Sequence, residues 1–355
     1  MSSRGKKKAS RIDGSKSASV TKVPTKKKMS PKKKWTLMVL SFLLGICLVL
    51  GIADLVVSWS VVHTLIHPEK IGWSDSPMSV RLSYDAFELE TANGMVYGWV
   101  LPAQNPFDED AEDWIPTEEY SDKTIVFAPN YDSCRDLMDM GGVEYFVEFC
   151  KAGYNVVTFD WTGSGYSDGD ENAFLLDKTE ELKAVVGYAE QTTEASFLAV
   201  QSIGFGCYPA AVATAECEAV DALILDSSYR NFSDVVFGNF GFWTAFDLAP
   251  VRATSQWLFS VITDIDADAI SMIDPINRMK GKDLFFIQGE SDEVFGSAHI
   301  KDLVSLATLD KDNEASYWLA TGTGHLRARS YDPETYFGKI SDFLKQAAGE
   351  ATEET

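Results

Sequence analysis

Histidine and cysteine are scarce in this sequence, with four and five residues respectively in a chain of 355. The cysteines form no C-x-x-C pair and no spacing typical of a metal site, so we predict no metal site. Cys207 and Cys217 would lie about 15 Å apart on one helix, which is too far for a disulfide. We expect the cysteines outside the apolar N-terminal segment to be small buried hydrophobic residues.

Positive charge is rare outside the first 34 residues. That segment carries thirteen Lys and Arg against one acid, Asp13, whereas the remainder has 18 basic and 52 acidic residues and a formal charge of −34. So acidic a body repels phosphate backbones, which excludes nucleic-acid binding by the globular part. Hydrophobic residues make up 45% of the chain, enough for a sizeable core.

A single long apolar run follows the basic tail. No charged residue occurs from Trp35 to Ala53, and Asp54 to Val57 extend the run to 23 residues. About 20 apolar residues span a bilayer. A buried core helix would show a polar face, and a signal peptide would have a shorter apolar region followed by a small-residue cleavage site. We therefore predict a transmembrane helix at 35–57.

The charge asymmetry predicts the orientation of this helix. The basic tail, 1–34, should stay cytoplasmic by the positive-inside rule, and its lysine clusters would attract anionic lipids. The rest of the chain is then extracytoplasmic on a single-pass protein of the cell membrane. It divides into a connector at 58–78, a folded domain at 79–347 and an acidic tail at 348–355.

Patterns typical of strands and helices alternate along the folded domain. Strands are expected at 80–101 (two, with a turn at 92–94), 124–129, 154–161, 197–201, 222–226, 284–289 and 316–321, and helices at 137–151, 177–191, 204–217 and 333–346. A polar loop is expected at 103–122. This alternation predicts a mostly parallel, doubly wound α/β sheet. The aromatic-rich stretch at 229–275 interrupts it and suits a helical lid across the strand ends.

The segment FLAVQSIGFG carries the main functional clue. A strand is expected to run into Ser202, with Gly204 two residues later and a helix beyond. A nucleophilic serine needs a sharp strand-to-helix turn, with small residues two before and two after it. The motif here reads VQSIG, with Val200 at the first small position. By itself such a serine could equally be a helix N-cap.

An acid and a histidine follow later strands in the expected order. Asp292 comes just after LFFIQG, and His325 just after SYWLAT. Two other histidines adjoin the membrane span, and His299 falls in the expected next helix. Asp226, after ALILD, is the alternative acid. The order Ser, Asp, His predicts a catalytic triad of Ser202, Asp292 and His325.

Residues 80–347 resemble the α/β-hydrolase family, particularly its serine esterase, lipase and aminopeptidase-like members. FDWTGSGYSDG is similar to the family's D-x-R-G-x-G-x-S turn, with Thr162 in place of Arg, and GTGHLRA is similar to its histidine loop. The resemblance implies acyl transfer: His325 takes the proton of Ser202, Asp292 holds the imidazole, and water releases the acyl group. No cofactor is implied.

The oxyanion hole departs from the family pattern. Where the family has His-Gly, this chain has Pro129 and Asn130. By position, the backbone N–H groups of Tyr131 and Ile203 would stabilise the oxyanion. Together with Val200, these differences make an inactive relative conceivable.

Two hypotheses follow for the function. The first is a surface-displayed serine hydrolase acting on a small-molecule or lipid-like acyl substrate through an ester, thioester or peptide bond. The second is a catalytically inactive α/β-hydrolase-fold module that binds a ligand or partner at the cell surface. The oligomeric state and the substrate cannot be predicted from the sequence.

Overall fold

The computed structural model describes residues 29–106, 119–309 and 313–350. The chain divides into two compact units, 1–52 and 53–355. Most of the predicted basic tail, part of the predicted polar loop at 103–122 and the last five residues of the predicted acidic tail lie outside the described residues.

Helix α1 (Pro31–Ile66) contains the predicted transmembrane segment. It is the only helix of the described chain that is long and apolar enough to cross a membrane, and its most apolar window is exposed throughout. Its last turns differ, because Val62 and Ile66 are buried in the unit that begins at Ala53. The predicted apolar helix is thus present, and its C-terminal end forms part of the folded body.

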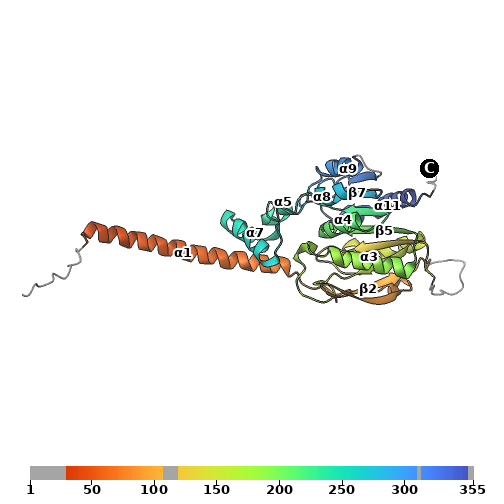
Figure 1. The fold of residues 1–355 in the computed structure, drawn as a ribbon, viewed down its shortest axis with the longest axis horizontal. Coiled ribbons are helices and arrows are strands. Elements are labelled where there is room, and N and C mark those ends of the chain that lie inside the picture. Colours follow the sequence, from red (N-terminus) through yellow and green to blue (C-terminus); the bar gives the residue numbers. More distant parts are fainter. Residues whose placement is uncertain (1–28, 107–118, 310–312, 351–355) are drawn as a thin grey trace, which may run out of the picture. The chain divides into compact units, whose positions relative to one another are not determined.

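One eight-stranded sheet organises the body in the described residues (Figure 1). Its order is β1-β2-β4-β3-β5-β6-β7-β8, antiparallel at β1–β2 and β2–β4 and parallel elsewhere. The strands are β1 (Asp85–Thr91), β2 (Gly94–Leu101), β3 (Lys123–Ala128), β4 (Asn155–Phe159), β5 (Phe197–Ile203), β6 (Ala222–Asp226), β7 (Asp283–Gly289) and β8 (Glu314–Ala320). The predicted mostly parallel α/β sheet is confirmed.

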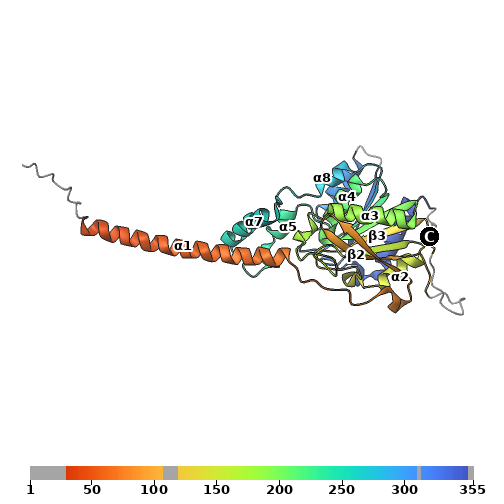
Figure 2. The same cartoon turned by 60° about the horizontal axis from the view of Figure 1, so that its bottom comes forward.

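Helices cover both faces of this sheet, as the two views of the fold show (Figures 1 and 2). After α1, the helices of the described chain are α2 (Glu144–Lys151), α3 (Thr179–Thr193), α4 (Cys207–Glu216), α5 (Phe232–Val236), α6 (Phe240–Trp243), α7 (Ala249–Thr263), α8 (Ile273–Arg278), α9 (Ile300–Thr308), α10 (Ala328–Tyr331) and α11 (Pro333–Ala347). Helices α3 and α4 share one hydrophobic core with the sheet, and α2 and α11 share the other. The segment predicted as a lid, 229–275, contains α5, α6, α7 and the start of α8.

Alternation along β5 decides which face each side chain meets. Leu198 and Val200 lie in the core shared with α3 and α4, and Ala199 lies in the core shared with α2 and α11. The strand continues to Ile203, two residues beyond the predicted end at 201, and one 3₁₀ turn at Gly204–Gly206 leads into α4. These two extra residues change the geometry of the site.

Candidate functional site

Asp292 and His325 lie side by side after β7 and β8, as predicted. The Nδ1 of His325 is 2.9 Å from Asp292 Oδ2, which also accepts a hydrogen bond from Gln288 Nε2 at 2.7 Å. The backbone N–H groups of Val294 and Phe295 donate to the other carboxylate oxygen, each at 2.9 Å. Burial alone would raise the pKa of Asp292, but His325 and these two N–H groups hold it below its ordinary value.

This arrangement fixes the tautomer of His325. An imidazole whose Nδ1–H donates to a carboxylate leaves Nε2 able to accept a proton. In the described residues Nε2 of His325 makes no hydrogen bond, and the ring packs edge-on against Phe295 at 4.3 Å between centroids. The alternative acid, Asp226, instead accepts from Tyr336 and Ser227, and burial raises its pKa to about 6. The pair can therefore act as a general base or as a hydrogen-bond acceptor.

Ser202 does not join this pair. It lies within β5, opposite Ala128 of β3 and Leu225 of β6, and its side chain is fully buried. Because it follows Leu198 and Val200 in alternation, it points toward α4, where its hydroxyl donates to the carbonyl of Ala128 at 3.2 Å. Within the described residues it makes no hydrogen bond to His325. The predicted sharp turn at Ser202 is therefore corrected: at this position the chain is regular strand.

The sharp turn occurs instead at Gly204. This residue has φ +58°, a conformation that side chains other than glycine's adopt with strain. The turn motif of this fold has small residues two before and two after the nucleophile. Ser202 and Gly206 occupy these two small positions, so Gly204 stands at the place of the nucleophile. The residue at the tip of the turn has no side chain.

The carboxamide of Asn130 fills the space above this turn. A Cβ added to Gly204 would lie 2.4 Å from Asn130 Oδ1. The same oxygen accepts a hydrogen bond from the N–H of Phe205 at 3.0 Å, and Nδ2 donates to Asp132 at 2.8 Å. The N–H after the turn residue is the one that a hydrolase of this fold uses in its oxyanion hole. Here a protein oxygen already occupies it.

Of the two predicted oxyanion donors, Tyr131 lies where it was expected and Ile203 does not. Ile203 is paired with Asp226 in the β5–β6 ladder, before the turn, so it does not occupy the position after the turn residue. Tyr131 follows β3 as expected; its carbonyl accepts from Asn172 Nδ2 at 2.6 Å, and its ring stacks on Phe174. The structure therefore moves the donor position from Ile203 to Phe205.

A buried ion pair holds the loop that carries Asn130. Asp160, after β4, accepts from the backbone N–H, Nε and Nη2 of Arg135, at 2.7, 3.0 and 2.6 Å, and from the N–H of Tyr166. Both side chains are almost completely buried. Thr162, at the place of the family's arginine, donates to Glu181. Arg135, from the loop after β3, is thus the partner of Asp160 in this chain.

Asp132 is a site residue that the sequence reasoning missed. The surrounding protein atoms desolvate its carboxyl group and so raise its pKa, although the hydrogen bond from Asn130 and the nearby His325 oppose this rise. Its position directly after Pro129-Asn130-Tyr131 was the only signal in the sequence. It adds a second carboxylate that interacts electrostatically with His325.

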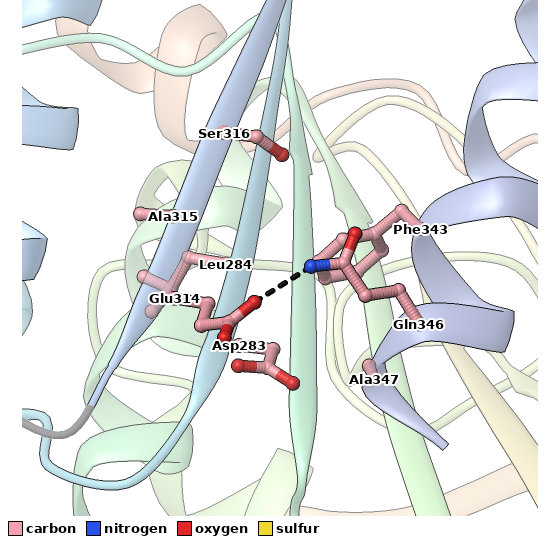
Figure 3. Close-up of a pocket in the computed structure, with 8 residues that line it drawn as sticks. All are labelled: Asp283, Leu284, Glu314, Ala315, Ser316, Phe343, Gln346 and Ala347. Carbon is pink, nitrogen blue, oxygen red and sulfur yellow. Dashed lines mark hydrogen bonds between the residues drawn. The ribbon is translucent and has the colours of Figure 1, made fainter. Parts of the chain in front are cut away.

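Among the parts of the chain that the structure describes, no metal centre accompanies this cluster. No group of three or more His, Cys, Asp or Glu side chains could hold a metal ion there. A cavity of about 90 Å³ lies at the other end of the sheet, where Asp283 and Glu314 begin β7 and β8, and Gln346 of α11 donates to Glu314 at 2.6 Å (Figure 3). Ligand sites usually measure about 300–1,000 Å³, so we do not regard this cavity as the functional site. All five cysteines are free.

No family model and no curated protein matches this sequence. Solved structures do resemble it. The esterase Pf2001 of Pyrococcus furiosus has a TM-score of 0.61 at 21% identity, over 79% of this chain and 97% of that chain. A puromycin-hydrolyzing peptidase of Mycobacterium tuberculosis has a TM-score of 0.56 at 17% identity, over 78% of this chain and 41% of that chain. The α/β hydrolase GrgF of Penicillium has a TM-score of 0.55 at 14% identity, over 76% of this chain and all of that chain. Together with the sheet order, these likenesses establish that the chain has the α/β-hydrolase fold.

Proposed function

We propose that this chain is a membrane-anchored α/β-hydrolase-fold module that binds a ligand or partner at the Asp292–His325 pair and forms no acyl-enzyme. One observation carries the proposal: the nucleophile position of the turn is Gly204, and Asn130 lies over it. An acyl-enzyme requires an attacking oxygen or sulfur atom at the tip of that turn, within hydrogen-bond reach of the histidine. Glycine supplies none.

The remaining groups suit hydrogen bonding to a bound molecule. His325 offers Nε2 as an acceptor, and the Asp132 carboxylate lies nearby. A hydroxyl, thiol or water molecule could donate to either group. Phe205 N–H is already paired with Asn130, so the site offers less stabilisation to a developing oxyanion than a hydrolase does.

A second candidate is the serine hydrolase with the triad Ser202, Asp292 and His325. The 2.9 Å contact between Asp292 and His325 favours it, as do the names of the similar structures, which include an esterase and a peptidase. In this mechanism β5 would have to end two residues earlier, so that Ser202 leaves the sheet and reaches His325 Nε2. Its substrate would be an ester, thioester or peptide with an apolar acyl group.

A fluorophosphonate probe separates the two candidates. The full chain in detergent is treated with the probe beside Ser202→Ala, His325→Ala and an active serine esterase. We expect no labelling of any form of this chain, because the residue at the tip of the turn, Gly204, has no hydroxyl group. Labelling of the wild type that disappears in Ser202→Ala would overturn the binding proposal and establish the serine hydrolase.

The membrane topology is a separate part of the proposal. The apolar run of α1 would span the bilayer, with the basic tail in the cytoplasm and the body outside. Protease added to intact cells should then digest the body and leave residues 1–34 protected. A body that resists digestion until the cells are lysed would reverse the orientation.

A further inference from the structure

Helix α7 is apolar on the side that faces solvent as well as on the side that faces the core. Its inner side is buried at Val251, Ser255, Leu258 and Phe259. Its outer stripe, at helical spacing, consists of Pro250, Ala253, Trp257 and Val261. A helix on the surface of a water-soluble body normally carries polar residues there. The only charged residue in α7 is Arg252, which is paired with Asp247.

Further exposed apolar side chains adjoin this stripe. Six of the exposed large hydrophobic residues of the described chain fall within the short stretch between 242 and 262. They are Phe242, Phe246, Leu248, Trp257, Val261 and Ile262, which we call the α7 face. Trp257 and Val261 are 57% and 60% exposed. Exposed apolar groups gathered in this way mark a contact surface.

Two hydrogen bonds attach α7 to α1 at the outer end of the expected membrane span. The hydroxyl of Ser58 donates to the carbonyl of Val251 at 3.1 Å, and the hydroxyl of Thr254 donates to Asp54 at 2.7 Å. Asp54 and Ser58 are one turn apart on α1, within the unit that begins at Ala53. Both views of the fold draw α7 beside this part of α1 (Figures 1 and 2). The helix is thus fixed where α1 leaves the predicted span at residue 57.

We infer that the α7 face lies in the interfacial layer of the same bilayer that α1 crosses. The inference rests on the proposed anchoring by α1. Tryptophan favours the membrane interface, and apolar side chains gain free energy by entering it. Asp264, Asp266 and Asp268 follow the helix directly and carry carboxylates that keep its C-terminal end near water. Contact therefore depends on apolar burial and not on attraction to anionic lipids.

The bilayer is the occupant that the structure favours over a second protein. Helix α7 is hydrogen-bonded to Asp54 and Ser58, at the end of a segment that is itself expected in lipid, so no other molecule needs to be recruited. Anchoring by α1 also keeps the face at a high effective concentration beside the membrane, which makes even a weak apolar contact persistent.

Depth-dependent quenching tests this inference on the full chain in phosphatidylcholine vesicles. Cys47 and Cys217, the two cysteines that are not buried, are replaced by Ser, and an environment-sensitive fluorophore is attached at Val261→Cys. Ala253→Cys provides a second position on the same stripe. The matched control is Gln191→Cys, exposed near the end of α3 at the opposite end of the sheet. A label on native Cys47, in the Cys217→Ser chain, reports on the span itself.

We expect nitroxide lipids to quench the labels at 47, 253 and 261 and to leave the label at 191 bright. If the label at 47 is quenched while those at 253 and 261 behave like 191, the α7 inference is overturned and anchoring stands. If the label at 47 is not quenched, anchoring fails and the inference fails with it. A blue-shifted label at 261 that lipids do not quench would indicate a protein occupant and would also overturn the inference.

Discussion

The two sides of the candidate site differ in what they hold at the ends of the sheet. On the β7–β8 side, Asp292 and His325 have the geometry of a catalytic acid–base pair. On the β3–β5 side, the turn carries Gly204, and Asn130 occupies the N–H that would stabilise an oxyanion. A well-formed Asp–His pair does not by itself identify a hydrolase, because its hydrogen bonds need no nucleophile to form.

The largest effect on activity should come from placing a nucleophilic hydroxyl group on the β3–β5 side. We expect the double substitution Gly204→Ser with Asn130→Gly to create measurable hydrolysis of short p-nitrophenyl esters. It supplies a hydroxyl at the turn and vacates the space that a Cβ at 204 requires. Gly204→Ser alone should remain inactive, because its Cβ would lie 2.4 Å from Asn130 Oδ1.

Two controls complete this experiment. Adding His325→Ala to the double variant should remove the gained activity, and Gly204→Ala with Asn130→Gly should never show it. Activity in the alanine form would mean that the hydrolysis does not depend on the new hydroxyl, and the assignment of Gly204 as the nucleophile position would then be wrong.

The ion pair under the Asn130 loop should matter for stability on the β3–β5 side. Asp160→Ala leaves the buried guanidinium of Arg135 without its partner, which costs about 3–5 kcal/mol. Breaking the exposed Arg230–Asp302 pair by Arg230→Ala should cost less than about 1 kcal/mol. Urea unfolding of both variants measures the difference. Equal losses would show that the buried pair does not hold this loop.

A smaller effect concerns stability: the carboxylates of Asp226 and Asp292 should make it depend on pH in opposite directions. Burial raises the pKa of Asp226 to about 6, so its folded form binds the proton more tightly than its unfolded form, and stability falls as pH rises from about 4 to 6. Asp292 has a lowered pKa, so its contribution is present above about pH 4 and is lost as pH falls through the lowered pKa of the folded protein.

Substitution checks these opposite signs. The wild type should lose up to about 3 kcal/mol of its free energy of unfolding between pH 4 and pH 7 through the titration of Asp226. Asp226→Asn should not show this loss. Asp292→Asn should instead flatten the acid limb of the curve. Thermal unfolding across pH 3–8 measures both, and a wild-type curve that Asp226→Asn leaves unchanged would contradict the raised pKa.

The sequence predicted the β7–β8 side well because each of its residues directly follows an apolar strand. Asp292 and His325 needed only the ends of LFFIQG and SYWLAT to be located. The β3–β5 side was harder to predict, since the glycines at 204 and 206 allow the turn motif to be placed in two ways, with either Ser202 or Gly204 as its central residue. In the predicted frame Gly204 is the small residue two places after the nucleophile Ser202, and β5 was expected to end at 201, two residues too early.

Local pattern could not decide between these frames. Ser202 and Ile203 extend β5 because they pair with β3 and β6, and such partners are distant in the sequence. The approach of Asn130 to Gly204 is likewise a contact across 74 positions. The sequence does contain the second frame, with small residues at 202 and 206 on either side of Gly204, but nothing local favours it over the first.

The packing of Asn130 over Gly204 also limits which substitutions this protein can accumulate in evolution. A serine at 204 clashes while Asn130 remains, and removing Asn130 first leaves the N–H of Phe205 buried without its partner, a cost of about 1–3 kcal/mol. Either single step is therefore unfavourable, and only the pair of changes opens the turn. The two positions are therefore epistatic: each substitution is tolerated only when the other is present, which opposes the stepwise acquisition of a nucleophile at 204.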